Sequence, residues 1–197
     1  MASAALTDVV DFWFGRPGDA EYGLPRKAWF EKDAGFDTEI RETFGNLVEN
    51  ALADPAPPAV DNSVSLLGHI IVLDQFTRNI YRGTARAFAG DAQALRLAMH
   101  ATGGGTDRQL LPVQRVFVYL PFEHSESIAM QQRSVVLFRA LAQSHPDLPW
   151  LANYLDYAEK HHAVVARFGR FPHRNAMLGR PSTPEETAFL SQPGSAF

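Results

Sequence analysis

Apolar residues recur at intervals of three and four positions along almost the whole chain, and no stretch alternates apolar with polar residues between hairpin turns. Intervals of three and four are typical of amphipathic α-helices, whereas a half-buried strand needs strict alternation. The sequence therefore predicts an all-α fold with no sheet, in which about eight helices form antiparallel pairs. No repeat motif of roughly 34 residues is visible, so the periodicity alone does not distinguish a bundle from a repeat array.

Capping residues and helix breakers indicate where these helices end. Gly83 and Gly169 each follow an apolar-periodic segment, as glycine does after many helix C-termini. Thr183, followed by Pro184 and Glu186, forms a capping-box pattern. The proline-rich segment 55–60 is expected to be an extended connector. The expected helices cover residues 7–14, 29–32, 33–54, 63–81, 91–101, 110–125, 127–145, 150–169 and 182–190.

Length and composition narrow the class of protein. A chain of 197 residues fits one domain, which we expect to span residues 1–197. The chain has no cysteine, which excludes disulfides and thiolate chemistry and suits a reducing, cytoplasmic compartment. The first residues lack a basic segment and include Asp8 and Asp11, so we expect no signal peptide. The longest apolar run is too short for a membrane span. A net charge of −4 disfavours nucleic acid as a partner.

The string "DQFTRNIYRG" places charged residues on an apolar helix. Asp74 and Arg78 are four residues apart on the apolar face of the central helix, so the two charges are expected to pair. Gln75, Asn79 and Arg82 accompany them. This group is expected to form either a structural clasp that finishes the helix or the floor of a binding site.

The string "LPFEHSES" combines carboxylates with a histidine at an expected break between helices. Pro121 is expected to kink or end the first of the two helices. Glu123, His124 and Glu126 follow it, and a carboxylate beside an imidazole is a common arrangement for acid–base chemistry. The alternative interpretation is a solvated corner between the helices.

A third group of polar residues lies at and beyond the end of the helix over 150–169. His161 falls on the apolar face of that helix, as a core histidine or as a site residue. After Gly169 the chain contains Arg170, His173, Arg174 and Asn175, with no acidic residue between positions 160 and 184. Arginine binds carboxylate or phosphate with a planar pair of donors. The segment is therefore expected either to bind an anion or to pair internally with the acidic strings described above.

Taken together, the strings "DFWFG", "LDQF", "RNIYRG", "YLPFEHSE", "YAEKH" and "RFGRFPHRNA" resemble the domain-of-unknown-function 924 family, which is found mostly in bacteria. The resemblance extends from Asp11 to Phe197, with Thr77 standing where we expect proline. It implies a TPR-like array of antiparallel helix pairs but implies no activity. The residues that match the family strings are Asp74, Gln75, Arg78, Asn79, Arg82, Glu123, His124, Glu126, His161, Arg170, His173, Arg174 and Asn175.

These residues lead to one main hypothesis and several alternatives. In the main hypothesis they line a central pocket for a small anionic molecule, in which Arg78, Arg170 and Arg174 bind the anion. His124 or His173, oriented by Glu123 or Glu126, would transfer any proton, although the residues name no reaction and leave open whether the protein is an enzyme. Alternatively, a TPR-like groove would bind a peptide carboxylate, or the residues would form a buried structural network. No cofactor is expected; a metal site formed by Glu123, His124, His161 and His173 is a weaker alternative.

Overall fold

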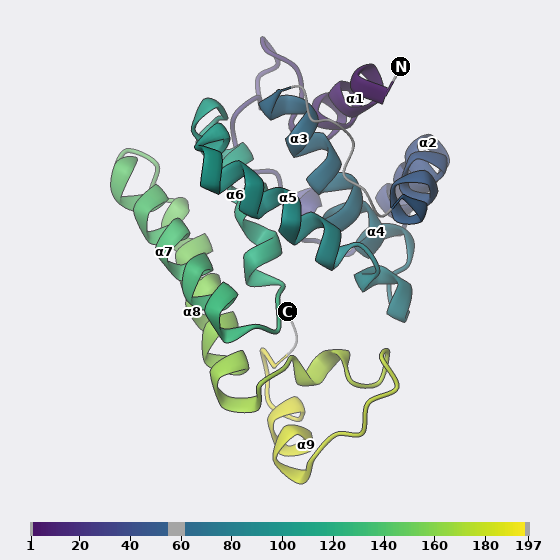
Figure 1. The fold of residues 1–197 in the computed structure, drawn as a ribbon, viewed down its shortest axis with the longest axis vertical. Helices are drawn as coiled ribbons and strands as arrows, with labels where there is room; N and C mark the ends of the chain where they lie inside the picture. Colours follow the sequence, from purple (N-terminus) through teal and green to yellow (C-terminus); the bar gives the residue numbers. More distant parts are fainter. Residues whose placement is uncertain (1, 55–61, 196–197) are drawn as a thin grey trace. The chain divides into compact units, whose positions relative to one another are not determined.

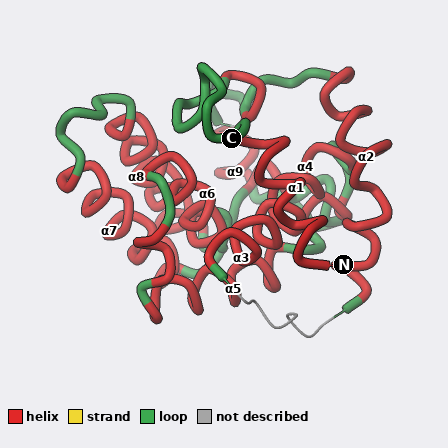
Figure 2. The backbone as a smooth tube through the Cα atoms, turned by 90° about the horizontal axis from the view of Figure 1, so that it is seen from above, coloured by secondary structure: helices red, strands yellow, loops and turns green. Residues whose placement is uncertain are grey.

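The computed structural model describes residues 2–54 and 62–195, and within these ranges it contains helices and loops but no strand (Figure 1, Figure 2). The predicted all-α fold is therefore confirmed, and the helices are compatible with a TPR-like arrangement. The expected connector over 55–60 lies outside the described residues. The α-helices are α1 (Ala2–Phe14), α2 (Ala34–Ala53), α3 (Ser63–Ile70), α4 (Thr77–Ile80), α5 (Asp91–Gly104), α6 (Pro112–Glu123), α7 (Ile128–Ser144), α8 (Leu151–Phe168) and α9 (Pro184–Leu190).

Two compact units divide the chain. Unit 1 comprises residues 1–82 and 86–121, and unit 2 comprises residues 83–85 and 122–197. Each unit has its own buried side chains, and each holds one group of the polar residues singled out above. The expectation of a single domain over residues 1–197 stays a prediction.

The central helix of unit 1 is not a uniform α-helix. The sequence predicts one α-helix over 63–81, whereas the structure has a π-helical segment, Ile71–Phe76, between α3 and α4. A π turn disturbs the regular ladder of backbone hydrogen bonds, and side chains donate to its carbonyl oxygens here. The Thr77 hydroxyl donates to the Leu73 oxygen at 2.8 Å, and Arg78 Nη1 donates to the Asp74 oxygen at 2.6 Å. Apolar periodicity does not reveal this change, because the segment is buried on most sides.

An aromatic cluster forms the core of unit 1. The fully buried Trp13 of α1 stacks on Trp29 with ring centroids 6.1 Å apart. It meets Phe76 and Phe117 edge-on at 5.5 and 5.7 Å. Large aromatic side chains contribute much of the stabilisation of such a core. The cluster therefore joins α1 and α6 to the π-helical segment that carries Asp74.

Two glycines allow other segments to approach the central helix closely. A Cβ atom at Gly68 would lie 2.4 Å from the Leu6 oxygen, and one at Gly90 would lie 2.2 Å from the Leu73 oxygen. Both distances are shorter than any side chain permits, so these positions require glycine. Gly90 directly precedes α5, and its close approach brings Asp91, the first residue of α5, next to the central helix.

In unit 2, α7 and α8 lie side by side as an antiparallel pair (Figure 1). Phe138 and Tyr154 stack between them, with ring centroids 6.4 Å apart and planes at 8°. The expected end of α8 is confirmed, because Gly169 caps it with a φ of 71°. A short 3₁₀ turn, Pro172–Arg174, follows it, so the arginine-rich segment leaves the helix as predicted.

The ends of α6 and α9 place further polar residues of unit 2. Pro121 does not end α6, which continues to Glu123. A proline close to a helix C-terminus removes only one backbone hydrogen bond, so the last turn persists. The predicted capping box of α9 is confirmed: the Thr183 hydroxyl accepts from the Glu186 nitrogen, and the Glu186 carboxylate accepts from the Thr183 nitrogen.

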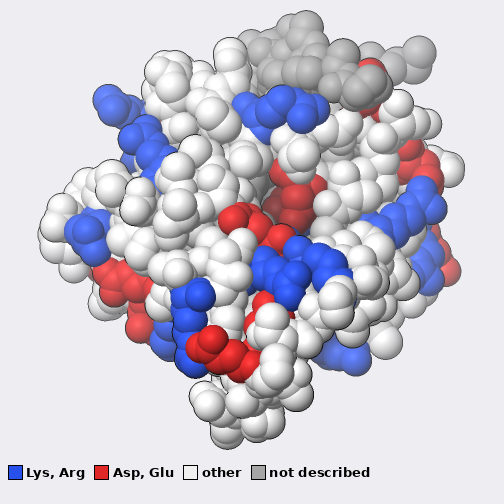
Figure 3. Space-filling view, turned by 60° about the horizontal axis from the view of Figure 1, so that its bottom comes forward, with Lys and Arg blue, Asp and Glu red and all other residues white. Residues whose placement is uncertain are grey.

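The surface carries both signs of charge. On the face shown in Figure 3, basic and acidic side chains are interspersed, and no large area of one sign stands out. This face lacks the basic stripe that is typical of nucleic-acid-binding proteins. Within the described ranges, no helix combines the length and apolarity that crossing a bilayer requires.

Candidate functional site

Asp74 and Arg78 form the predicted pair in unit 1. Asp74 is fully buried, its Oδ1 lies 3.2 Å from Arg78 Nη1, and its Oδ2 accepts from Gln75 Nε2 at 2.5 Å. Arg78 also donates to both carboxylate oxygens of Asp91, at 2.8 and 3.1 Å. Burial alone would lower the pKa of Arg78, but the carboxylates of Asp74 and Asp91 raise it above its ordinary value. The arginine is therefore a fixed cation between two carboxylates.

Asn79 and Arg82 converge on one carboxylate, Asp37, in the first turn of α2. Asn79 Nδ2 donates to Asp37 Oδ1 at 2.7 Å, and Arg82 donates to both Asp37 oxygens at 2.9 Å. Partial burial works against ionisation of this carboxyl, but the hydrogen bonds from Arg82 and Asn79 lower the pKa of Asp37. These contacts fasten α4 to the start of α2, which supports the clasp interpretation for both residues.

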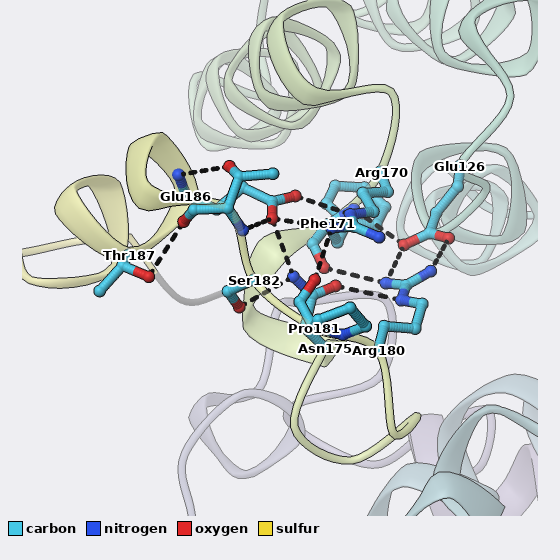
Figure 4. Close-up of polar contacts among 10 residues, drawn as sticks. Glu126, Arg170, Phe171, Asn175, Arg180, Pro181, Ser182, Glu186 and Thr187 are labelled. Atoms are coloured by element: carbon cyan, nitrogen blue, oxygen red, sulfur yellow. Dashed lines mark hydrogen bonds and ion pairs between the residues drawn. The ribbon is translucent and has the colours of Figure 1, made fainter.

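Arg170 and Asn175 hold the start of α9 in unit 2 (Figure 4). Arg170 donates to both oxygens of the buried Glu186 carboxylate, at 2.6 and 2.8 Å. Asn175 Nδ2 lies 3.3 Å from the same carboxylate and 3.1 Å from the Ser182 hydroxyl. The hydrogen bond from Arg170, helped by the Thr183 nitrogen, lowers the pKa of Glu186 to about 2. Glu186 is thus ionised at any pH at which the protein works.

Glu126 and Arg180 form a second clasp beside the first (Figure 4). Arg180 donates to both Glu126 oxygens, at 2.6 and 2.8 Å, and Glu126 Oε1 also accepts from the Phe171 nitrogen at 2.8 Å. Burial opposes ionisation, but Arg180 and the Phe171 nitrogen lower the pKa of Glu126. Arg180 Nε donates to Asn175 Oδ1 at 3.0 Å, so the two clasps share Asn175. The basic segment therefore pairs internally, in part with the predicted acid Glu126.

His161 and Glu123 form a buried pair at the centre of unit 2. The two side chains are 6% and 4% exposed, and His161 Nδ1 lies 3.2 Å from Glu123 Oε1. The same Nδ1 lies 2.8 Å from the Tyr157 carbonyl oxygen, which can only accept, so Nδ1 carries the ring proton. Burial lowers the pKa of His161 to about 3, and the surrounding His124, His173 and Arg174 act in the same direction. His161 is therefore neutral at pH 7.

The ring of Phe171 lies next to three predicted site residues, His161, His173 and Arg174. Its buried ring lies 5.5 Å from the ring of His161 and 5.5 Å from that of His173. The Arg174 guanidinium lies over the same ring at 4.7 Å, and Arg174 is only 6% exposed. The ring of His124 lies 6.4 Å from that of His161. We call Glu123, His124, His161, His173 and Arg174 the histidine cluster.

Gln131 of α7 fixes the turn that carries part of this cluster. The Gln131 side chain is fully buried, and its Nε2 donates to the carbonyl oxygens of Glu123 and Ser125, both at 2.6 Å. One amide therefore sets the backbone on both sides of His124. Across the helix pair, burial and the Glu123 carboxylate raise the pKa of Tyr154 to about 12.

Sequence reasoning missed several residues that complete these groups: Asp37, Asp91, Gln131, Arg180 and Glu186 as a partner of Arg170. Asp37, Asp91 and Glu186 lie in the first turns of helices, where acidic residues are common for local reasons. Because this position has a local explanation, the sequence does not indicate that these carboxylates also pair with distant arginines. Arg180 belongs to the acid-free segment already singled out, and its presence there was the available signal.

The two groups lie in different units. The unit 1 residues find the partners described above within unit 1, and the unit 2 residues find theirs within unit 2. That all of them line one central pocket stays a prediction. Among the described residues, no group of three or more histidine and carboxylate side chains is arranged to hold a metal ion.

Comparisons with known proteins place this geometry in a family. The family model described as "Bacterial protein of unknown function (DUF924)" matches residues 9–194. The chain belongs to this family. The chain is also similar to the solved structure of a protein of unknown function from Agrobacterium tumefaciens. The two are 39% identical, the match covers 97% of this chain and 99% of that chain, and the TM-score is 0.80. No protein of curated function matches. Membership in DUF924 thus supports the fold and leaves the activity to be inferred from the site.

Proposed function

We propose that the histidine cluster of unit 2 binds a small anionic molecule. The observation that carries this proposal is the convergence of basic side chains around His161. Arg174, His124 and His173 all act electrostatically on the His161 ring, whose Nδ1 lies beside the Glu123 carboxylate. The guanidinium of Arg174 and any protonated histidine of this group would attract an anion.

The exposure of the side chains indicates which of them a ligand would contact first. His124 and His173 are intermediate in exposure, whereas Glu123, His161 and Arg174 are buried. In the proposal, the two histidines contact the ligand from the solvent side and Arg174 attracts its charge from behind. Arg170 and the clasp around Glu186 serve to hold the segment that carries His173 and Arg174.

The histidines of the cluster give it a capacity for proton transfer. Because the proton of neutral His161 lies on Nδ1, its Nε2 is a hydrogen-bond acceptor, and its lowered pKa leaves any proton transfer at neutral pH to His124 or His173. Glu123 beside Nδ1 would stabilise the ring if it gained a second proton. The proposal names no reaction. It includes a cytoplasmic location, which the cysteine-free sequence leads us to expect.

Ligand screening of the wild-type chain and one matched pair of variants test the proposal. Phosphate, nucleotides, small dicarboxylates and a short peptide with a free C-terminal carboxylate would be screened by thermal shift and then titrated calorimetrically. We expect at least one anion to raise the melting temperature, and the peptide arm separates a peptide-binding module from a small-molecule site.

The variant pair locates the effect. Arg174→Met keeps an apolar contact with Phe171 but removes the charge, so the ligand-induced shift should disappear. Arg167→Met removes an exposed arginine from the same segment and should leave the shift unchanged. The proposal is wrong if no anion shifts the wild type, or if both variants respond as the wild type does.

A further inference from the structure

Unit 1 contains a small cavity between the end of α2 and the faces of α3 and α5. Its volume is about 10 Å³. A cavity needs roughly 10–15 Å³ of such space to hold one water molecule. The lining is about half polar, and it is formed by Ala51, Asp54, His69, Leu73, Gln93, Arg96 and Leu97.

Two polar atoms of this lining are buried without a hydrogen-bond partner among the described residues. They are Nδ1 of His69, a residue that is 9% exposed, and Oε1 of Gln93. Native proteins leave few such atoms unsatisfied, because a buried polar group that loses its bond to water is destabilising. The orientation of the Gln93 amide is fixed, since its Nε2 donates to the Asp54 carbonyl oxygen at 2.8 Å. Turning the amide over would place two carbonyl oxygens against each other.

We propose that this cavity binds one water molecule, which hydrogen-bonds to both Gln93 Oε1 and His69 Nδ1. The chemistry of the lining selects water over an ion. Gln93 Oε1 can only accept a hydrogen bond, so it would repel a halide. Arg96 and Asp54 both line the cavity and carry opposite charges, so the lining favours neither a metal cation nor an anion by its net charge.

The bound water has a preferred orientation. It donates one hydrogen to Gln93 Oε1 and the other to Nδ1 of a neutral His69. Burial lowers the pKa of His69, with Asp54 acting against that shift, so the ring is largely neutral at pH 7. In this orientation the ring proton of His69 lies on Nε2.

The site links three helices. His69 belongs to α3 and Gln93 to α5, while Asp54 is the residue that ends α2. The water completes a chain of hydrogen bonds from His69 through Gln93 to the Asp54 carbonyl. The end of α2 is thereby fastened to α3 and to α5, the helix that begins with Asp91.

Nuclear magnetic resonance of the full chain tests this site. In the wild type we expect a cross-peak between water and the Gln93 side-chain amide, with the sign of a long-lived buried water. The ¹⁵N shifts of His69 should report an unprotonated Nδ1 and a protonated Nε2. His69→Leu should abolish the water cross-peak, whereas His100→Leu, which removes an exposed histidine of α5, should preserve it.

Three outcomes would overturn the proposal. One is a wild-type spectrum without the water cross-peak, which needs no variant to be folded. Another is a protonated Nδ1 that donates directly to Gln93 Oε1. The third is a His69 signal that shifts on exchange of chloride for another halide, or on exchange of sodium for another cation, because an ion would then occupy the cavity.

Discussion

The chain contains two short strings that end in Arg-Asn, "QFTRN" in unit 1 and "RFPHRN" in unit 2, and their arginines have different surroundings. In both, the asparagine does the same work: Asn79 donates to Asp37 and Asn175 to Glu186, and each carboxylate also accepts from an arginine. The arginines differ. Both lie over an aromatic ring, Arg78 over Phe88 and Arg174 over Phe171, but Arg78 also lies between two carboxylates, whereas Arg174 lies beside three histidines.

This difference distinguishes the structural role of Arg78 from the ligand-binding role that we propose for Arg174. An arginine between two carboxylates has its charge balanced by the protein, so it acts as a clasp. Arg174 lies over the ring of Phe171, and its charge also acts on the carboxylate of Glu126. The following variants test how sharply the two strings differ.

The largest effect is expected for Asp74→Ala. This change removes a fully buried carboxylate and leaves Arg78 with Asp91 as its carboxylate partner. Breaking a buried ion pair from one side is strongly destabilising, so the free energy of unfolding should fall by about 3 kcal/mol. Urea denaturation measures this directly. Asp91→Asn, at a partly exposed carboxylate, should cost less, and a near-neutral Asp74→Ala would instead favour a solvent-lined site around Arg78.

A smaller effect is expected for Glu186→Gln in the unit 2 clasp. Hydrogen bonds to a charged group are worth about 2 kcal/mol, and Arg170 would lose most of that contribution at pH 7. The pKa of Glu186 is lowered to about 2 in the fold, so its stabilisation is present above the ordinary pKa of a glutamate. It is lost as the pH falls from about 5 toward 2.

The pH dependence supplies the control for this variant. The melting temperature of the wild type should fall steeply as the pH decreases over that acid range, and Glu186→Gln should flatten the slope. Glu185→Gln, at the exposed neighbour that pairs with Arg167, should leave the slope unchanged. Equal slopes in the wild type and Glu186→Gln would contradict the role of the clasp.

Much of this architecture could be predicted from the sequence, for identifiable reasons. Helical periodicity, the glycine after α8 and the capping box are local signals, and they gave the fold class and the end of α8. The pair of Asp74 and Arg78 was also local, because it follows from a spacing of four residues on one helix face. The partners that were missed, Asp37 and Asp91, lie 45 and 13 residues from the arginines they bind. Such pairings depend on how helices pack, which periodicity does not encode.

A still smaller effect is expected for the two asparagines. Asn79→Ala and Asn175→Ala each remove a buried amide that donates to an ionised carboxylate. Each carboxylate keeps its arginine, so the loss should be about 1 kcal/mol in both cases. Urea denaturation of the two variants side by side sharpens the comparison. Similar values would support one shared role, and a neutral value for one of them would show that the two strings are alike only in sequence.

The smallest effect is expected for Arg167→Met, although Arg167 belongs to the same acid-free segment as Arg170. Arg167 pairs with Glu185, and both side chains are more than half exposed, at 53% and 63%. Exposed ion pairs contribute roughly 0–1 kcal/mol because water and salt screen them. Methionine also keeps an apolar contact with Phe168, over which the guanidinium lies. A double-mutant cycle with Glu185→Gln should therefore give a coupling below about 0.5 kcal/mol. A larger coupling would mean that the arginines of the basic segment stabilise unit 2 together, as one network. A loss of ligand response in Arg174→Met could then result from the loss of that network, so the stability of this variant would have to be measured as well.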